Sequence, residues 1–358
     1  MLRSWRQKAT FTDIVVTGIG IFIGIMLLSA FYRAIFVPPY NLKYNYFTWA
    51  DLIVKGLALG GVYALIAMGY TMVYGILRMI NFSHSEVFMS GPFTAVFLAR
   101  GLASIGFYQN YPFISILLLG LLSAAVSMTV AILVERIAYR PLRNAPRLVP
   151  LITAIGASFF LIYTFRGLYG SGVFAYPTIP ALQGSWTLFG VFELYKTQVV
   201  VIVFAVIMMV ILYYIVQRTN IGKAMRAVSE DKEAAALMGI DVDRIIVFTF
   251  ALGGISAGAA GVLYALQFPV VNAFMGFIPG LKAFTAAVLG GIGSVPGAFL
   301  GAMILGVLES LGPNLFLDPL GITNPSQLKD AIAFLILVFI LIFRPSGILG
   351  ERGVQTKV

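Results

Sequence analysis

The sequence contains no cysteine and a single histidine, His84, in 358 residues. Without cysteine there can be no disulfide bond, thiolate metal site or cysteine nucleophile, and one histidine argues against a histidine metal centre or a Ser-His-Asp triad. The pair Gly222-Lys223 lacks the upstream glycine and the following Ser or Thr of a phosphate-binding loop. We therefore expect no catalytic residue, no metal site and no cofactor bound by this chain.

Charged residues are also scarce, whereas apolar residues are abundant. Charged residues make up 11% of the chain and apolar residues 60%, whereas soluble domains carry about 25% charged residues. This composition predicts an all-α polytopic membrane protein of about 9–10 transmembrane or re-entrant helices. The predicted spans are roughly 14–36, 52–77, 87–99, 114–134, 148–166, 198–216, 245–267, 283–308 and 328–343.

The net charge of +10 comes from basic residues that gather in short clusters between the apolar runs. Such clusters are typical of the positive-inside rule, so we expect a lipid bilayer and no nucleic acid as partner. Clusters after the fourth, sixth and last spans predict that both termini are cytoplasmic. The predicted division is an N-terminal extension with an extra transmembrane helix (1–50), a transmembrane domain (51–350) and a cytoplasmic tail (351–358).

The predicted span 283–308 must enter and leave the membrane on one side if the last basic cluster is cytoplasmic. Its centre, 289–297 (LGGIGSVPG), breaks a helix where a re-entrant turn requires it. Non-helical backbone at membrane depth is tolerated only inside protein or beside a wet cavity. The alternative is a pair of full spans, with one helix missed elsewhere. Candidate pathway residues in this turn are Gly290, Gly291, Gly293 and Ser294.

A second break, Asn81–Glu86 (NFSHSE), follows the second predicted span. The spacing of Ser83 and Glu86 is that of a capping box and predicts a helix that begins at His84, with a kink at Pro92. Polar residues beside membrane spans are costly unless they face water, protein or a substrate. The alternative is that the motif lies at the cytoplasmic surface and only caps a helix. Candidate pathway residues here are Tyr70, Asn81, Ser83, His84, Ser85 and Glu86.

The longest polar interval in the chain is Gly222–Asp243 (GKAMRAVSEDKEAAALMGIDVD). Ser229 is a suitable N-cap, the acidic residues after it complement the helix dipole, and Gly239 can end the helix in a left-handed conformation. The interval therefore predicts a charged cytoplasmic helix over 229–239 that is presented to a partner. Its candidate contact residues are Arg226, Ser229, Glu230, Asp231, Lys232, Glu233 and Gly239.

Three further features bear on packing within the bundle. Glu135, which begins the first basic loop, is expected to pair with a neighbouring arginine, and Glu309 is expected at the surface. The Gly-x-x-x-Gly pairs that begin at Gly254 and Gly297 predict close contact between helices.

Four stretches of the sequence closely resemble the LivH-type permeases of branched-chain amino-acid ABC importers. They are 60–82 (GGVYALIAMGYTMVYGI, then MINF), 226–240, 282–297 (KAFTAAVLGGIGSVPG) and 344–350 (RPSGILG). The resemblance runs from about Leu52 to Gly350. In the family the motif after the second span reads Asn-Phe-Ala-His-Gly-Glu, whereas this chain has Ser83 and Ser85 in place of Ala and Gly.

The resemblance implies a permease of the bacterial inner membrane that takes up branched-chain or other neutral amino acids. It implies a LivM-like second permease, two cytoplasmic ATPase subunits that bind ATP and Mg²⁺, and an extracytoplasmic substrate-binding protein as partners. It also implies that 229–239 is the coupling helix that docks in a groove of an ATPase.

Two alternatives of different scope remain open from the sequence. An importer of the same class could carry urea or another small polar solute. A stand-alone secondary transporter or channel would instead need coupling groups within its spans and would have no use for a presented charged helix. An integral membrane enzyme is disfavoured, because no histidine cluster, cysteine or paired-carboxylate site is present.

Overall fold

A computed structural model describes residues 46–143, 145–146, 148–188, 192–318, 324–343 and 347–349. The predicted first span (14–36), most of the 1–50 extension and the 351–358 tail lie outside these residues. Within the described ranges, eight helices are long and apolar enough to cross a membrane, and strands are few and short. The predicted all-α polytopic class is therefore confirmed.

The elements of the described chain are mostly long helices. The long helices are α2 (Tyr46–Leu77), α3 (His84–Ser104), α5 (Pro112–Val134), α6 (Leu148–Tyr169), α7 (Lys196–Arg218), α10 (Val242–Gln267), α12 (Val295–Gly312) and α13 (Lys329–Phe343). The short helical elements are α4 (Phe107–Asn110), η2 (Glu135–Tyr139), η3 (Arg140–Leu142), η4 (Pro180–Leu182), α8 (Asn220–Glu230), α9 (Lys232–Leu237), α11 (Phe277–Gly290), η5 (Pro313–Leu317) and η7 (Pro325–Leu328). The strands form two antiparallel pairs, β1 (Phe174–Ala175) with β4 (Val270–Val271) and β2 (Ser185–Leu188) with β3 (Phe192–Tyr195).

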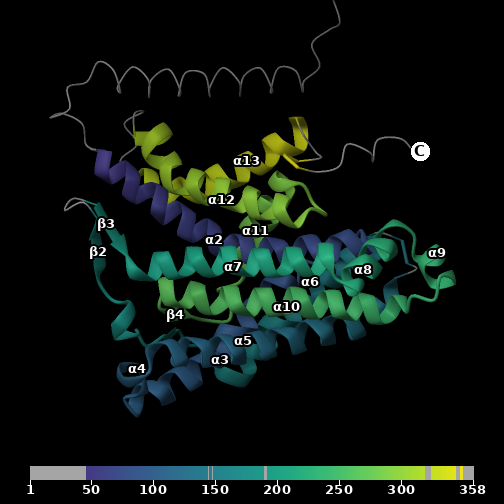
Figure 1. Cartoon of the computed structure of the whole chain (residues 1–358), viewed down its shortest axis with the longest axis horizontal. Helices are drawn as coiled ribbons and strands as arrows, with labels where there is room; N and C mark the ends of the chain where they lie inside the picture. The colour runs from purple at the N-terminus through teal and green to yellow at the C-terminus, as the bar shows by residue number, and fades with distance from the viewer. Residues whose placement is uncertain are drawn as a thin grey trace, which may run out of the picture.

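Helix α2 is the centre of the bundle. It packs against α12, α10, α11 and α7, and its residues 62–68 are buried. Figure 1 shows α2, α7, α10 and α5 running along the length of the molecule, with the β2–β3 hairpin at one end and α9 projecting from the other. We call these the β end and the α9 end.

The two predicted Gly-x-x-x-Gly faces both pack closely against a neighbouring helix. A Cβ at Gly254 would lie 2.7 Å from the Cα of Met128 on α5, which leaves no room for a side chain. One turn later, the Ser123 hydroxyl donates a hydrogen bond to the Gly258 carbonyl at 2.6 Å. On α12, a Cβ at Gly297 would lie 2.6 Å from the Gly290 carbonyl oxygen. Both packing predictions are confirmed.

The segment predicted to enter and return forms a helical hairpin of α11 and α12, joined by a turn at 291–294. A Cβ at Gly75, near the end of α2, would lie 3.9 Å from the Cα of Gly293, so the turn lies toward the α9 end. The predicted helix–turn–helix arrangement is confirmed, with arms that begin earlier and end later than 283–308, and the return to the same side of the membrane stays a prediction. Helix α11 has 14 residues and is about 21 Å long, short of the ~20 residues that cross a bilayer.

Candidate functional site

The Asn81–Glu86 segment lies inside the bundle. The exposed fraction is 3% for Asn81 and 0% for Glu86. His84 stacks edge-on against Tyr70 with ring centroids 4.8 Å apart, and a Cβ at Gly69 would overlap the His84 ring. Gly69 lies eight residues before the end of α2, about 12 Å along the helix axis. Helix α3 therefore begins well within the bundle, and the alternative of a surface cap is wrong.

Helix α3 begins at His84 as predicted, but the predicted capping box does not form. Ser83 has helical backbone angles (φ −70°, ψ −4°) and makes no side-chain cap. Its hydroxyl instead donates to the Asn81 side-chain oxygen at 2.6 Å, and the Tyr139 hydroxyl donates to the same oxygen at 3.0 Å. The helix also continues through Pro92 as one element. Ser83 thus stabilises the loop that precedes α3 rather than the first turn of the helix.

The Glu86 carboxylate is buried, and only one of its two oxygens accepts hydrogen bonds. Its Oε1 accepts hydrogen bonds from the Ser158 hydroxyl of α6 at 2.6 Å and from the Ser85 hydroxyl at 3.1 Å. Its Oε2 has no hydrogen-bond partner among the described residues. Burial of a carboxylate with an unmatched oxygen is costly, and such groups within membrane helices mark functional positions.

The first turn of α3 is in backbone contact with the first turn of α11. A Cβ at Gly276 would lie 2.9 Å from Glu86 Oε2, and a Cβ at Gly280 would overlap the Ser85 side chain. Only glycine at these positions allows the two helix starts to meet at this separation. The contact joins the polar segment to the hairpin that carries the glycine turn.

The glycine turn itself is formed where the sequence predicts it. Gly291 and Gly293 have φ of 106° and 102°, which other residues rarely adopt. Ser294 caps α12, because its hydroxyl accepts from the Gly297 amide at 3.2 Å. Residues after α13 also reach the turn, since the Leu349 amide donates to the Gly290 carbonyl at 2.9 Å.

A small cavity of about 10 Å³ lies between the polar segment and the glycine turn, with room for about one water molecule. It is lined by Tyr70, Tyr74, Ile80, Asn81, Phe284, Ala287 and Ile292. The structure thus brings two predicted pathway residues, Tyr70 and Asn81, together with Ile292 of the turn. The other predicted residues do not line this cavity, and Glu86 bonds toward α6 instead.

The predicted charged helix over 229–239 is divided in two. Helix α8 runs through Ser229 and Glu230, and the Ser229 hydroxyl donates back to the Arg226 carbonyl at 2.7 Å. Asp231 caps the separate helix α9, accepting from the Glu233 amide at 2.9 Å and the Ala234 amide at 3.0 Å. The prediction of Ser229 as N-cap is wrong, because the upstream residues are helical and Asp231 takes that role.

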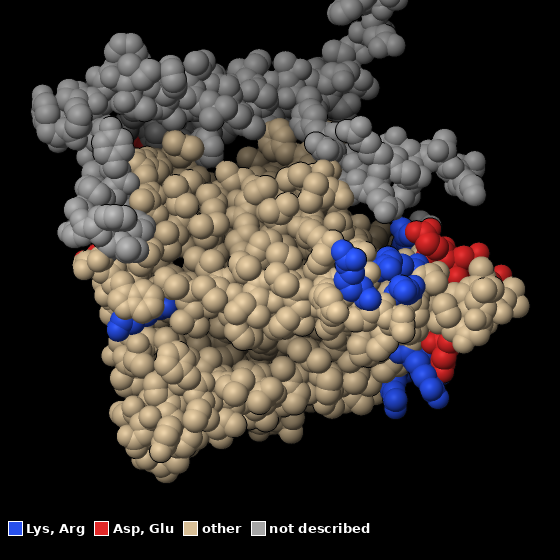
Figure 2. Space-filling view, viewed as in Figure 1, with Lys and Arg blue, Asp and Glu red and all other residues tan. Residues whose placement is uncertain are grey.

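Helix α9 projects from the bundle and carries exposed apolar residues at its end. The exposed fraction is 89% for Leu237 and 83% for Met238. Gly239 has a φ of 83°, so it ends the helix in the left-handed conformation that was predicted. Figure 2 shows most of the visible described surface free of charge, with most of the Lys, Arg, Asp and Glu gathered around this projection and a smaller basic patch at the β end.

Polar contacts tie the α8–α9 unit to the ends of the long helices. The Arg226 guanidinium donates to the Val216 carbonyl of α7. The Arg78 guanidinium donates to the Ser229 carbonyl at 3.3 Å, and Arg78 itself has a φ of 57°, which is unfavourable for a non-glycine residue. Arg78 lies between α2 and the Asn81–Glu86 segment, so it connects α8 directly to the polar segment.

An arginine network surrounds the start of α10. Arg143 pairs with Glu135, which confirms the predicted pairing of Glu135 with a nearby arginine, and also with Asp243. Arg140 pairs with Asp243 as well. Partial burial lowers the pKa of the Lys232 ammonium on α9, and the positive charge of Arg143 lowers it further. The ion pairs hold the η2–η3 segment against the start of α10.

One buried ionic cluster was not predicted. Lys282 Nζ on α11 lies 2.6 Å from Glu309 Oε1 on α12 and 2.6 Å from Asp330 Oδ1 on α13. The prediction of Glu309 at the surface is wrong, because its side chain is 1% exposed. Lys282 also lies 5.7 Å from the ring centroid of Tyr63 on α2. The cluster joins the hairpin to α13 and to the central helix.

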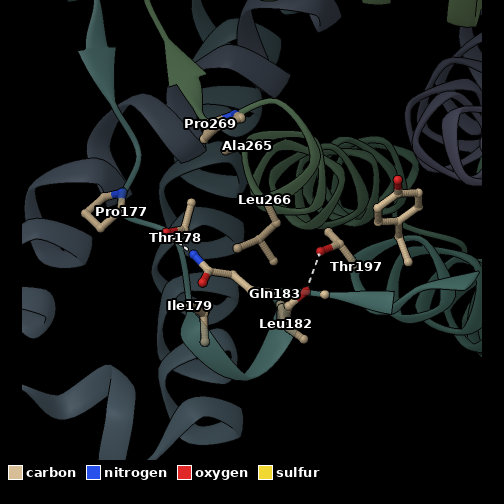
Figure 3. Close-up of a pocket in the computed structure, with 11 residues that line it drawn as sticks. Pro177, Thr178, Ile179, Leu182, Gln183, Thr197, Ala265, Leu266 and Pro269 are labelled. Atoms are coloured by element: carbon tan, nitrogen blue, oxygen red, sulfur yellow. Dashed lines mark hydrogen bonds between the residues drawn. The ribbon is translucent and has the colours of Figure 1, made fainter. Parts of the chain in front are cut away.

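A larger cavity of about 220 Å³ opens at the β end, between the end of α10 and the 177–197 segment (Figure 3). Its wall is held by hydrogen bonds from Gln183 to Thr178 at 2.8 Å and from Thr197 to the Leu182 carbonyl at 3.1 Å. Leu266 points into it from α10. None of the predicted pathway residues lines it.

Residues 52–341 match the family described as branched-chain amino acid transport system / permease component. The chain belongs to this family. Among curated relatives, the high-affinity branched-chain amino acid transport system permease protein BraD of Pseudomonas aeruginosa is 42% identical over 85% of this chain and 96% of its own length. The LivH proteins of Salmonella typhimurium and Escherichia coli K12 are 40% and 39% identical, each over 84% of this chain and 95% of their length.

Membership in this permease family agrees with the eight apolar helices of the described chain. The protein is a multi-pass membrane permease of the bacterial inner-membrane type. The resemblance drawn from the sequence motifs is confirmed.

Proposed function

We propose that this chain is the permease subunit of an ATP-driven importer of branched-chain amino acids, and that α8 and α9 receive the movement of its ATPase partners. The observation that carries this proposal is the apolar tip of α9, formed by Leu237 and Met238. Two large apolar side chains more than four-fifths exposed, on a helix otherwise rich in charge, fit a groove on a soluble partner better than a lipid surface.

The contacts around α8 give the route by which such a movement would reach the pathway. A displacement of α9 moves α8 and α10, because α8 is separated from α9 only by Asp231 and α10 follows after Gly239. Arg78 then carries the displacement from the Ser229 carbonyl to the segment that leads into His84. Rocking of the two permeases against each other would widen the small cavity beside Asn81.

The chemistry of the polar segment is suited to a zwitterionic solute with an apolar side chain. The unmatched Glu86 oxygen, which lies outside the small cavity, offers an acceptor for an ammonium group, and the start of α3 favours a carboxylate. Phe284, Ile80 and Ile292 supply an apolar wall to the cavity. These pathway assignments are proposals, and an importer of urea or another small polar solute would use Asn81 without needing the apolar wall.

The proposed complex has three kinds of partner. A second, LivM-like permease lies beside this chain in the bilayer, two ATPase subunits bind ATP and Mg²⁺ at the α9 end, and a substrate-binding protein docks at the β end. The permease itself catalyses no reaction.

The test is reconstitution with candidate partners, measuring uptake of leucine and substrate-stimulated ATP hydrolysis. A Leu237→Ser/Met238→Ser variant should lose both activities and should no longer retain the ATPase subunits on purification. The matched control is Ala236→Ser, which changes a neighbouring exposed residue of α9 and should behave as wild type. Retention of coupled uptake by the double variant would refute the role of α9.

A secondary transporter is the second candidate, because Glu86 and the Lys282–Glu309 pair are buried ionisable groups of the kind that couple ion flow to transport. Lys282 and Glu309 neutralise each other, which weakens that candidate. Uptake in proteoliposomes without ATPase subunits or ATP would establish it and would exclude the importer.

A further inference from the structure

A groove with a basic end runs between the η2–η3 segment and the first turns of α10. It has a volume of about 500 Å³ and lies at the α9 end of the bundle. Its lining residues are Arg136, Arg140, Asp241, Asp243, Arg244, Val247, Phe248 and Ala251. It takes no part in the proposed pathway or in the exposed tip of α9.

The α10 wall of the groove changes from basic to apolar along the helix. On α10, the lining residues Arg244, Val247, Phe248 and Ala251 have the spacing of one helix face, with the arginine nearest the α9 end. The other wall is lined by Arg136 and Arg140, and Leu133 and Ile137, which neighbour Arg136 along the chain but lie outside the lining, are 49% and 73% exposed. The two segments run in opposite directions, so their arginines meet at one end of the groove and the apolar residues of α10 continue beyond it.

The charges of the groove leave one cation without a partner. Asp241 pairs with Arg244 at 2.9 Å, and Asp243 is shared by Arg140 and Arg143. Arg136 is exposed and forms no ion pair with any described residue. Three arginines against two aspartates give the lining a positive balance, which is complementary to an anion.

We propose that this groove binds an anionic phospholipid of the cytoplasmic leaflet, with its phosphate at Arg136 and an acyl chain along Val247 and Phe248. A soluble anion would need only the basic end, whereas the apolar wall continues for two helical turns beyond it. An ATPase subunit would approach the exposed end of α9, while exposed Leu133 and Ile137 mark this face as one that contacts lipid. Basic pockets between membrane helices at the cytoplasmic side bind lipid head groups in this way.

The experiment uses the full chain with Phe248→Trp as a reporter in phosphatidylcholine nanodiscs. Brominated phosphatidylglycerol and brominated phosphatidylcholine are compared as quenchers of the new indole, and the parent protein with its three native tryptophans gives the background. We expect phosphatidylglycerol to be preferred about fivefold, the effect of one arginine near an anionic surface. In the reporter background, Arg136→Gln should abolish the preference, and Arg136→Lys should keep most of it.

The matched control is Arg218→Gln, which removes the same charge from an exposed arginine at the α9 end, outside the groove. It should leave the preference unchanged. Equal quenching by the two lipids, or an equal loss in the Arg218 variant, would overturn the proposal. Displacement of phosphatidylglycerol by inorganic phosphate alone would assign the site to a soluble anion. If Arg136→Gln weakens ATPase binding in detergent and leaves lipid selectivity intact, the groove is a protein interface instead.

Discussion

The buried Lys282 cluster allows a sharp test of what an ion pair contributes inside this bundle. Lys282 Nζ lies 2.6 Å from Glu309 Oε1, and the two side chains are 3% and 1% exposed. Lys282→Met removes the cation but keeps the length of the side chain, so Glu309 is left as an unpaired charge among helices. Loss of one partner of a buried pair typically costs about 3–5 kcal/mol.

The chain contains a matched control for this substitution. Lys55 pairs with Asp51 at the same 2.6 Å separation, but the two side chains are 45% and 27% exposed. An exposed pair of this kind on one helix contributes about 0.3–0.5 kcal/mol, because water screens and solvates both charges. Lys55→Met should therefore lower the free energy of unfolding by roughly one tenth of the loss caused by Lys282→Met.

The assay is equilibrium unfolding in mixed detergent micelles with increasing dodecyl sulfate, followed by circular dichroism. A Lys282→Met/Glu309→Met double variant should recover most of the lost stability, because an apolar replacement of both partners leaves no buried charge. Asp330 is 41% exposed and can remain solvated. If Lys282→Met costs no more than Lys55→Met, or if the double variant is less stable than the single one, the reasoning is refuted.

Two further predictions concern the helix starts. Asp231→Ala should destabilise α9 by about 1 kcal/mol and speed amide hydrogen exchange in its first turn, whereas Ser229→Ala should not; the opposite result would restore Ser229 as the cap. Gly280→Ala should cost about 1–3 kcal/mol in the same unfolding assay, because its Cβ overlaps Ser85. Gly156→Ala, in open space on α6, should be neutral or stabilising, and equal losses at both glycines would contradict the close contact.

Features that depend on local pattern could be predicted from the sequence. Hydropathy gave most of the described spans to within a few residues, and the position of the glycine turn followed from the chain's own helix breakers and the parity of the basic loops. The close packing at Gly254 could be predicted because small residues at Gly-x-x-x-Gly spacing in membrane helices typically mark a contact between helices. Each of these signals lies within about one helix or one loop.

The errors arose where a distant residue, or a neighbouring helix, changed the role of a local motif. Ser83 has the spacing of a capping residue, but the Asn81 side chain takes its hydroxyl, and that amide is held in turn by Tyr139. Tyr139 is 58 residues away from Asn81 along the chain. Ser229 failed as a cap for a related reason, because the amphipathic α8 extends through it and Asp231 is the first residue free to cap.

The Lys282–Glu309 pair shows how the hairpin itself could have revealed a buried contact. Gly290 packs against Gly297 and Ala286 against Gly301, which sets the register of the two arms. That register places Lys282 level with Leu305, and Glu309 follows Leu305 by one helical turn on the same face. Long side chains of opposite charge within one turn of each other across a hairpin are in reach of an ion pair. The predicted turn therefore already implied that Glu309 faces α11 rather than solvent, once the glycines are taken as the points where the arms touch.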